Sequence, residues 1–549
     1  MSASSRPAGV DVATQSLARP AAVMAAGTAL SRLTGLGRFV ALAFALGVAE
    51  SRLADAYNIA NTLPVVLYEL VLGGILTSVF VPILVQELRT KDREEAWRSV
   101  SALVSVAMAA LVAMTLLIVA LAPVIIDVFS TRVDGPEGAE QERLATFFLR
   151  IFAPQIVLLG ATAVAAALIN AHGRFGPPMF SPIVNNLILI ATFLLFAAVA
   201  AGTPTAGSVA DDSGQKLLLG LGATGGVAAM AAVNWWFVRR LGGRIRLLLD
   251  WRHPAVRRVA VLSLWTFLFV SVNALGTAVS FWLANGRQGG PTAYVLGFAF
   301  FQLPIGIAAV SIMTALVPKL SAHYVDGDDR LFRARLGGGL RATAMLMLPA
   351  TAGYLVLADP LVQVLLQHGV AQEASARLVA DVLRLFAVGL VPFAAFLLLS
   401  RAFYARQDNR TTALWNILAV AVTIGLDFAL YPVWDVRGLA LAHSLGFVVG
   451  AVVLAVVLTR RVGDLEARRT FEELAKVAAA SILAADAMLA VVALSEWALD
   501  AGDPRALLQL FVGGAAGLAT FVYVARRLDV EDLGLFRRII PARFLPAAR

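Results

Sequence analysis

Long apolar blocks joined by short polar links limit what this 549-residue chain can fold into more than any other feature. A run of about 20 apolar residues can cross the hydrocarbon core of a bilayer as a helix. Hydrophobic residues make up 59% of the chain and charged residues 15%, whereas soluble domains have about 45–50% and about 25%. The pattern therefore predicts an all-α, polytopic protein of the cell membrane.

The blocks predict about 14 transmembrane helices, arranged as two six-helix lobes followed by two C-terminal helices. Two six-helix bundles with a cavity between them are a common plan for transporters. The expected parts are a cytoplasmic tail (1–19), an N-lobe (20–240), a basic cytoplasmic linker (241–256), a C-lobe (257–461), spans 13 and 14 (462–527) and a cytoplasmic C-terminal tail (528–549).

Basic residues are concentrated in alternate links, which predicts the orientation. The link after the sixth span holds seven arginines between Arg239 and Arg258 against one acid, Asp250. The link near 134–142 and the pair Asp211–Asp212 are acidic instead. Because basic links stay in the cytoplasm, both termini are expected there. The net charge of +9 then reflects membrane topology, and no nucleic-acid binding is expected.

Motifs of enzymes and bound cofactors are nearly absent. The chain has no cysteine, which excludes disulfides and thiolate metal sites, and its five histidines are scattered without metal-ligand spacing. The G-x-G-x-x-G match at 220–225 follows no strand and lies in an apolar helix, where glycines favour close helix packing. We expect no catalytic residues and no cofactor, apart from a coupling cation.

The stretch SRLTGLGR (31–38) places Arg32 and Arg38 inside the first apolar block, where an ionised side chain is unfavourable. Ser31 and Gly35 continue a stripe of small residues that lets another helix approach closely. At 100° per residue the two arginines lie about 120° apart, so both can face one groove. The planar fork of arginine suits a phosphate better than lysine does. This pattern predicts a cationic cavity for an anionic ligand.

A structural alternative is that Arg32 and Arg38 pair with Asp55 or Glu69 and fix the helix packing. Both acids belong to a polar stripe on the second span, 55–86. Such a stripe faces water or a partner rather than lipid. The mid-span proline indicates a gating bend or a passive kink. The expected gating and cavity residues of this span are Asp55, Asn58, Thr62, Pro64 and Glu69.

In the second half, Asp427 is a lone carboxylate in an apolar span, one turn after Thr423. Such a group is by default a site for a cation or a proton. A carboxylate that is hydrogen-bonded near the outer interface is the alternative.

Several stretches together resemble the MurJ/MviN family of lipid II flippases, with an actinobacterial-like Ala, Val and Arg content. They are SRLTGLGRFVALAFALG (31–47), DAYNIANTLP (55–64), FVPIL (80–84), PQIVLLGATAVAAALINAHGRFGPPMFSPIVNNLILI (154–190) and RAFYARQDNRTT (401–412). The resemblance covers essentially all the expected spans.

The resemblance implies a fold of the multidrug/oligosaccharidyl-lipid/polysaccharide (MOP) exporter superfamily. It also implies that lipid II, the diphosphate-linked peptidoglycan precursor, moves from the inner to the outer leaflet by alternating access. Arg32 and Arg38 would bind the diphosphate, Asp55 would match the acid that opens the family's second helix, and Asp427 would be a candidate Na⁺ site. The last two spans, 474–498 and 505–527, would form a groove for the polyprenyl tail.

The chain departs from the family pattern at two places. Tyr68 and Glu69 stand where many members have two arginines, and Ala299 stands where many have an arginine in the eighth span. Export of another lipid-linked glycan or of an amphipathic compound is therefore an alternative function. A non-transporting scaffold for the cell-wall synthesis machinery is a third, although a scaffold would not need arginines inside the membrane.

Overall fold

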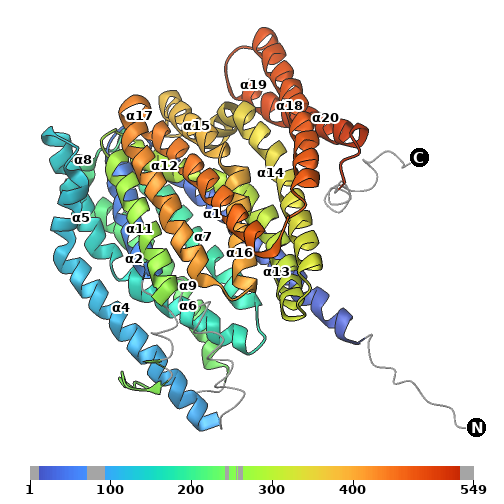
Figure 1. Cartoon of the computed structure of the whole chain (residues 1–549). Coiled ribbons are helices and arrows are strands. Elements are labelled where there is room, and N and C mark those ends of the chain that lie inside the picture. Colours follow the sequence, from blue (N-terminus) through green and yellow to red (C-terminus); the bar gives the residue numbers. More distant parts are fainter. Residues whose placement is uncertain (1–11, 71–92, 242–245, 255, 258–263, 532–549) are drawn as a thin grey trace, which may run out of the picture.

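The computed structural model describes residues 12–70, 93–241, 246–254, 256–257 and 264–531. The regular elements in these ranges are all helices, and most run lengthwise through one bundle (Figure 1). The all-α, polytopic class predicted from the sequence is confirmed.

The first half of the chain contributes eight described helices. They pack mainly against one another, with α7 between α1 and α9 and with α5 against α2 and α4. Their bounds are α1 (Val12–Leu46), α2 (Leu53–Tyr68), α4 (Arg93–Ser130), α5 (Gly135–Phe152), α6 (Gln155–Ala171), α7 (Gly176–Val199), α8 (Ala206–Asp211) and α9 (Ser213–Arg239).

The second half packs in the same manner, with α17 against α11 and α16, and α14 against α15. A π-helical turn, Ile305–Ala309, follows Pro304 and joins α12 to α13. The bounds are α11 (Leu264–Ala284), α12 (Gly290–Pro304), α13 (Val310–Val325), α14 (Asp329–Leu366), α15 (Glu373–Ala387), α16 (Leu390–Ala405) and α17 (Asn409–Val462). The boundaries of the two predicted lobes stay predictions.

Within the described residues, 11 helices are long and apolar enough to cross a membrane, or 12 if the bent pair α15–α16 forms one span. At about 1.5 Å per residue, the 54-residue α17 would exceed twice the thickness of the hydrocarbon core. Its backbone breaks at Asp435 (φ 52°, ψ −140°), between the expected spans 411–431 and 438–460. The count of 14 stays a prediction, since the span expected at 55–86 continues beyond the described residues.

Helices α18 (Ala467–Ala498), α19 (Asp503–Leu508) and α20 (Gly514–Arg527) stand at the side of α14 (Figure 1). A small apolar cluster that includes Met345, Val477 and Phe521 holds them. The nearly buried guanidinium of Arg341 on α14 also donates to Glu466, 2.9 Å away. In the ranges that the structure describes, the last two long helices are thus anchored mainly on α14 of the second half.

We expect Gly389→Val to lower the melting temperature of the detergent-purified protein. A Cβ at Gly389, between α15 and α16, would lie 2.9 Å from the Cα of Ser444 on α17, and such overpacking costs about 1–3 kcal/mol. Gly353→Val is the matched control, because a Cβ there has no neighbour within 4 Å. Equal melting temperatures of the two variants would contradict this account of the packing.

Candidate substrate cavity

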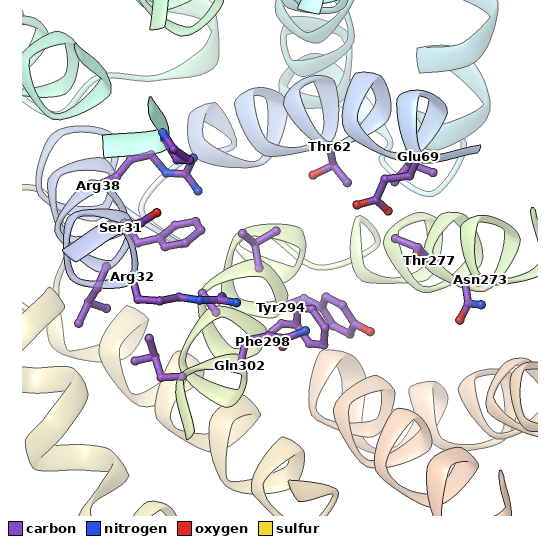
Figure 2. Close-up of a pocket in the computed structure, with 18 of the residues that line it drawn as sticks. Ser31, Arg32, Arg38, Thr62, Glu69, Asn273, Thr277, Tyr294, Phe298 and Gln302 are labelled. Atoms are coloured by element: carbon purple, nitrogen blue, oxygen red, sulfur yellow. The ribbon is translucent and has the colours of Figure 1, made fainter. Parts of the chain in front are cut away.

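A cavity of about 770 Å³ lies between the two halves of the bundle. The helices that form its walls are α1, α2 and α7 on one side and α11, α12 and α17 on the other. Figure 2 shows the side chains that point into it. The lining residues used below are Ser31, Arg32, Gly35, Arg38, Thr62, Glu69, Asn273, Thr277, Ser280, Tyr294, Phe298, Ala299, Gln302 and Thr423.

The predicted arginine stretch of α1 lines this cavity. Close contact with α7 fixes it: Asn186 lies 3.6 Å from where a Gly35 Cβ would stand, and its side-chain nitrogen donates to the Ser31 carbonyl, 3.2 Å away. A Cβ at Gly306, in the π-helical turn, would lie 3.1 Å from the guanidinium carbon of Arg32. Small residues on both sides therefore leave room for the long arginine side chain.

Neither arginine forms an ion pair with an acid in the described part of the chain. Arg38 lies over the ring of Phe39, 4.6 Å from its centre. Glu69 and Arg38 project from different sides of the cavity (Figure 2), and Asp55 has other partners. The structure thus gives no support to the alternative in which these arginines only fix the packing.

The second helix divides its predicted stripe between two places. Thr62 and Glu69 line the cavity, whereas Asp55, Asn58 and Pro64 are buried outside it. Pro64 lies inside a helix that continues to Tyr68. The five residues of the predicted stripe therefore do not share one site, although they were expected on one face of α2.

The wall from the second half carries no arginine, lysine or acid among its described lining residues. Asn273 and Gln302 supply amides, and Tyr294 and Phe298 supply aromatic rings (Figure 2). Ala299 also faces the cavity, so the residue that replaces a family arginine leaves this wall neutral. The charge of the cavity therefore comes from α1 and α2.

Asp55 connects the two halves at one end of the cavity. Its buried carboxylate accepts hydrogen bonds from the backbone N–H of Gly289 (2.7 Å) and from the backbone N–H (3.2 Å) and hydroxyl (2.7 Å) of Thr292. It thereby caps the N-terminus of α12, where a negative charge is favourable. Asn58 donates to the same hydroxyl. Asp55 and Asn58 therefore belong to a set of contacts between the halves, here called the gate, rather than to the cavity wall.

Glu50 forms a second cap of the same kind, which the sequence did not reveal. One carboxylate oxygen accepts from the Gln372 backbone N–H and the Ser375 hydroxyl, both at 2.6 Å, at the start of α15. The other accepts from the backbone N–H groups of Val48 and Ala49. An acid directly after an apolar span was the only local signal, since Gln372 and Ser375 lie 322 and 325 residues further along the chain.

Asp427 is buried beside the cavity. Its Oδ2 accepts from the hydroxyl of Ser280, 2.8 Å away, and its Oδ1 has no hydrogen-bond partner. The Thr423 hydroxyl instead donates to the carbonyl of Ala419. No group of three or more metal-ligating His, Cys, Asp or Glu side chains occurs among the described residues, so a cation here would need hydroxyl and carbonyl ligands.

The helical bundle with its central cavity has the fold of solved transporters of the MOP superfamily. The chain is similar to a solved lipid II flippase MurJ in an inward closed conformation, with a TM-score of 0.73 and 21% identity over 92% of this chain and 99% of that one. An inward-facing MATE-family transporter aligns with a TM-score of 0.62 and 14% identity over 80% of this chain and 99% of that one.

The chain belongs to the lipid II flippase MurJ family, whose model matches residues 42–503. A probable lipid II flippase MurJ of Rhizobium meliloti is 27% identical over 530 residues, 96% of each chain. A lipid II flippase MurJ of Burkholderia cenocepacia is 27% identical over 438 residues, 79% of this chain and 82% of that one. Members of this family are transporters and not enzymes, as the sequence indicated.

We expect Asp55→Ala to open the gate. Loss of hydrogen bonds to a charged group costs about 1.5–3 kcal/mol, which shifts the equilibrium from closed to open by about 10- to 150-fold. The chain has no native cysteine, so spin labels can be placed on Ala139→Cys and Val433→Cys, two exposed positions at this end. The labels should move apart in the variant.

Glu373→Ala is the control for this measurement, because its carboxylate lies at the same end and, in the described part of the chain, its ion pair is with Arg377 of the same helix. It should leave the distance distribution unchanged. An unchanged distribution in Asp55→Ala as well would show that the carboxylate does not hold the gate.

Proposed function

We propose that this protein moves lipid II from the inner to the outer leaflet by alternating access between its two halves. One observation supports the proposal above the rest: Arg32 and Arg38 face a cavity between the halves, and neither forms an ion pair with an acid among the described residues. A diphosphate would supply the missing negative charge and would accept paired hydrogen bonds from both guanidinium groups. Family membership supports the same ligand.

The remainder of the cavity suits the neutral part of such a ligand. Amides and hydroxyls of Asn273, Thr277 and Gln302 can bond to sugar and peptide groups, and Tyr294 offers an aromatic face. A volume of about 770 Å³ is within the range of small-molecule sites. In this proposal Ser31 and Gly35 shape the diphosphate site, and the polyprenyl tail lies outside the cavity.

Helices α18 and α20 are the proposed groove for that tail. They present exposed apolar side chains, among them Ile482 and Leu489 on α18 and Leu518 on α20. Such side chains are compatible with a polyprenyl chain or with ordinary membrane lipids.

We also propose that the gate faces outward and that both termini lie in the cytoplasm. Hydrogen bonds between the halves cluster at the gate, for example from Arg52 and Gln141 to Asn285. The acidic link near 134–142 lies at this end. The basic residues Arg239 and Arg461 lie in the last turns of α9 and α17, at the end of the bundle away from the gate. A cytoplasmic location of that end would require such basic residues.

Asp427 is the proposed site of a coupling cation, Na⁺ or a proton. Its Oδ1 is buried and unpartnered, and its partner Ser280 also lines the cavity. Binding there could therefore be linked to the substrate. Association with the cell-wall synthesis machinery is a further proposal that rests on the family alone.

Another lipid-linked glycan is the second candidate substrate. The observation that favours it is the replacement of cationic family positions by Glu69 and Ala299, both of which face the cavity. Depletion of the protein separates the two, because the intermediate that accumulates on the inner leaflet identifies the substrate.

Reporter fusions test the orientation. A fusion near residue 248 should read as cytoplasmic and one near residue 138 as external, because basic links are retained inside. The opposite pattern would overturn the proposed topology.

Arg32→Lys and Arg38→Lys test the diphosphate site in cells. Each keeps the charge but loses the bidentate fork, so about 1–3 kcal/mol of binding and roughly 5- to 150-fold in affinity should disappear. We expect normal membrane levels and failure to complement a flippase-depleted strain. Arg240→Lys, at an exposed arginine that lies over Trp236, should complement; full complementation by both cavity variants would contradict the proposal.

A further inference from the structure

Another cavity, of about 650 Å³, lies on the flank of the first half, away from the arginine pair of α1. It is formed by α5 together with α4, α8 and α9, which stand at one edge of the bundle (Figure 1). The lining residues used below are Pro123, Glu142, Arg143, Thr146, Phe147, Arg150, Asp211 and Lys216.

Arg150, like Arg32 and Arg38, is a charged side chain inside an expected membrane span and needs a partner there. It is exposed on α5 and falls five residues inside the span expected at 145–170, about 8 Å from the outer end of that span. No acid among the described residues pairs with it. A lipid-facing guanidinium at this depth is stabilised when its side chain extends to the level of the lipid phosphates.

The inner part of this cavity is cationic and partly apolar. Lys216 donates from Nζ to the carbonyl of Ala210, 2.8 Å away, and its ammonium lies 5.3 Å from the centre of the Phe147 ring. These contacts hold the charge in place, and neither neutralises it. With Arg150 and the hydroxyl of Thr146, the inner part offers donors of the kind that a phosphate accepts.

The outer part holds two acids and one arginine. Arg143 pairs with Asp211 at 3.0 Å, and both side chains are well exposed. Glu142 is two helical turns from Arg150 on the same helix. An anion would therefore be drawn to the inner part, and a headgroup that carries no net negative charge would gain little.

We propose that this cavity binds the phosphate of an anionic phospholipid, with Arg150 and Lys216 as its two cationic contacts. The acyl chains would lie against the exposed apolar residues of α4, such as Leu121 and Val124. With the gate facing outward, this lipid belongs to the outer leaflet. The choice of the outer leaflet rests on the proposed orientation, whereas the lipid-binding site itself does not.

Photo-cross-linking tests the site on the purified full-length protein in vesicles. The probes are photoreactive phosphatidylglycerol and photoreactive phosphatidylcholine, and labelling is mapped to α5 and α9 by mass spectrometry. Phosphatidylglycerol should label these helices several-fold more strongly. Arg150→Gln and Lys216→Gln should each reduce that labelling about fivefold. Arg240→Gln, an exposed arginine on another part of the bundle, is the control and should change nothing here.

Three outcomes would overturn the proposal. Equal labelling by the two phospholipids would show that the site does not select for charge. Unchanged labelling in a folded Arg150→Gln/Lys216→Gln double variant would show that these cations do not hold the headgroup. Displacement of the probe by undecaprenyl diphosphate, at concentrations where added phosphatidylglycerol does not compete, would assign the cavity to the lipid carrier instead.

Discussion

The structure depends first on how two ionised guanidinium groups are kept inside a membrane-spanning helix. An arginine at the centre of a bilayer is unfavourable by at least about 2.5–3.5 kcal/mol unless water or an anion solvates it. Here Gly35 and Asn186 hold α1 against α7, and Gly306 leaves space beside Arg32. The resulting cavity stays wide enough for solvent or ligand. In the proposed function, an anionic substrate would replace water as the partner of these two charges.

The gate also depends on how buried charges are stabilised. Asp55 and Glu50 each satisfy the free N–H groups at the start of a helix from the other half. A helix N-terminus provides the positive partial charge that a buried carboxylate needs. Because water can take over these hydrogen bonds when the gate opens, the closed and open states can differ by only a few kcal/mol. Alternating access requires such a balance.

The sequence was sufficient for the class of fold, because apolar blocks of membrane length have few other stable forms. It also identified Arg32, Arg38, Thr62 and Glu69 as cavity residues from helical periodicity. It did not separate Thr62 and Glu69 from Asp55, which faces the same side of α2 but lies in its first turn, against α12. Periodicity reports direction around a helix and says nothing of depth or of partners far along the chain. Glu50 was missed for the same reason.

The most direct test of the account is equilibrium binding to purified protein of lipid II and of an analogue without the diphosphate. We predict that the parent protein prefers lipid II and that Arg38→Lys loses most of this preference while it retains its binding of the analogue. A lysine variant that discriminates between the two ligands as the parent does would contradict the central claim, since the arginines would then serve the fold alone.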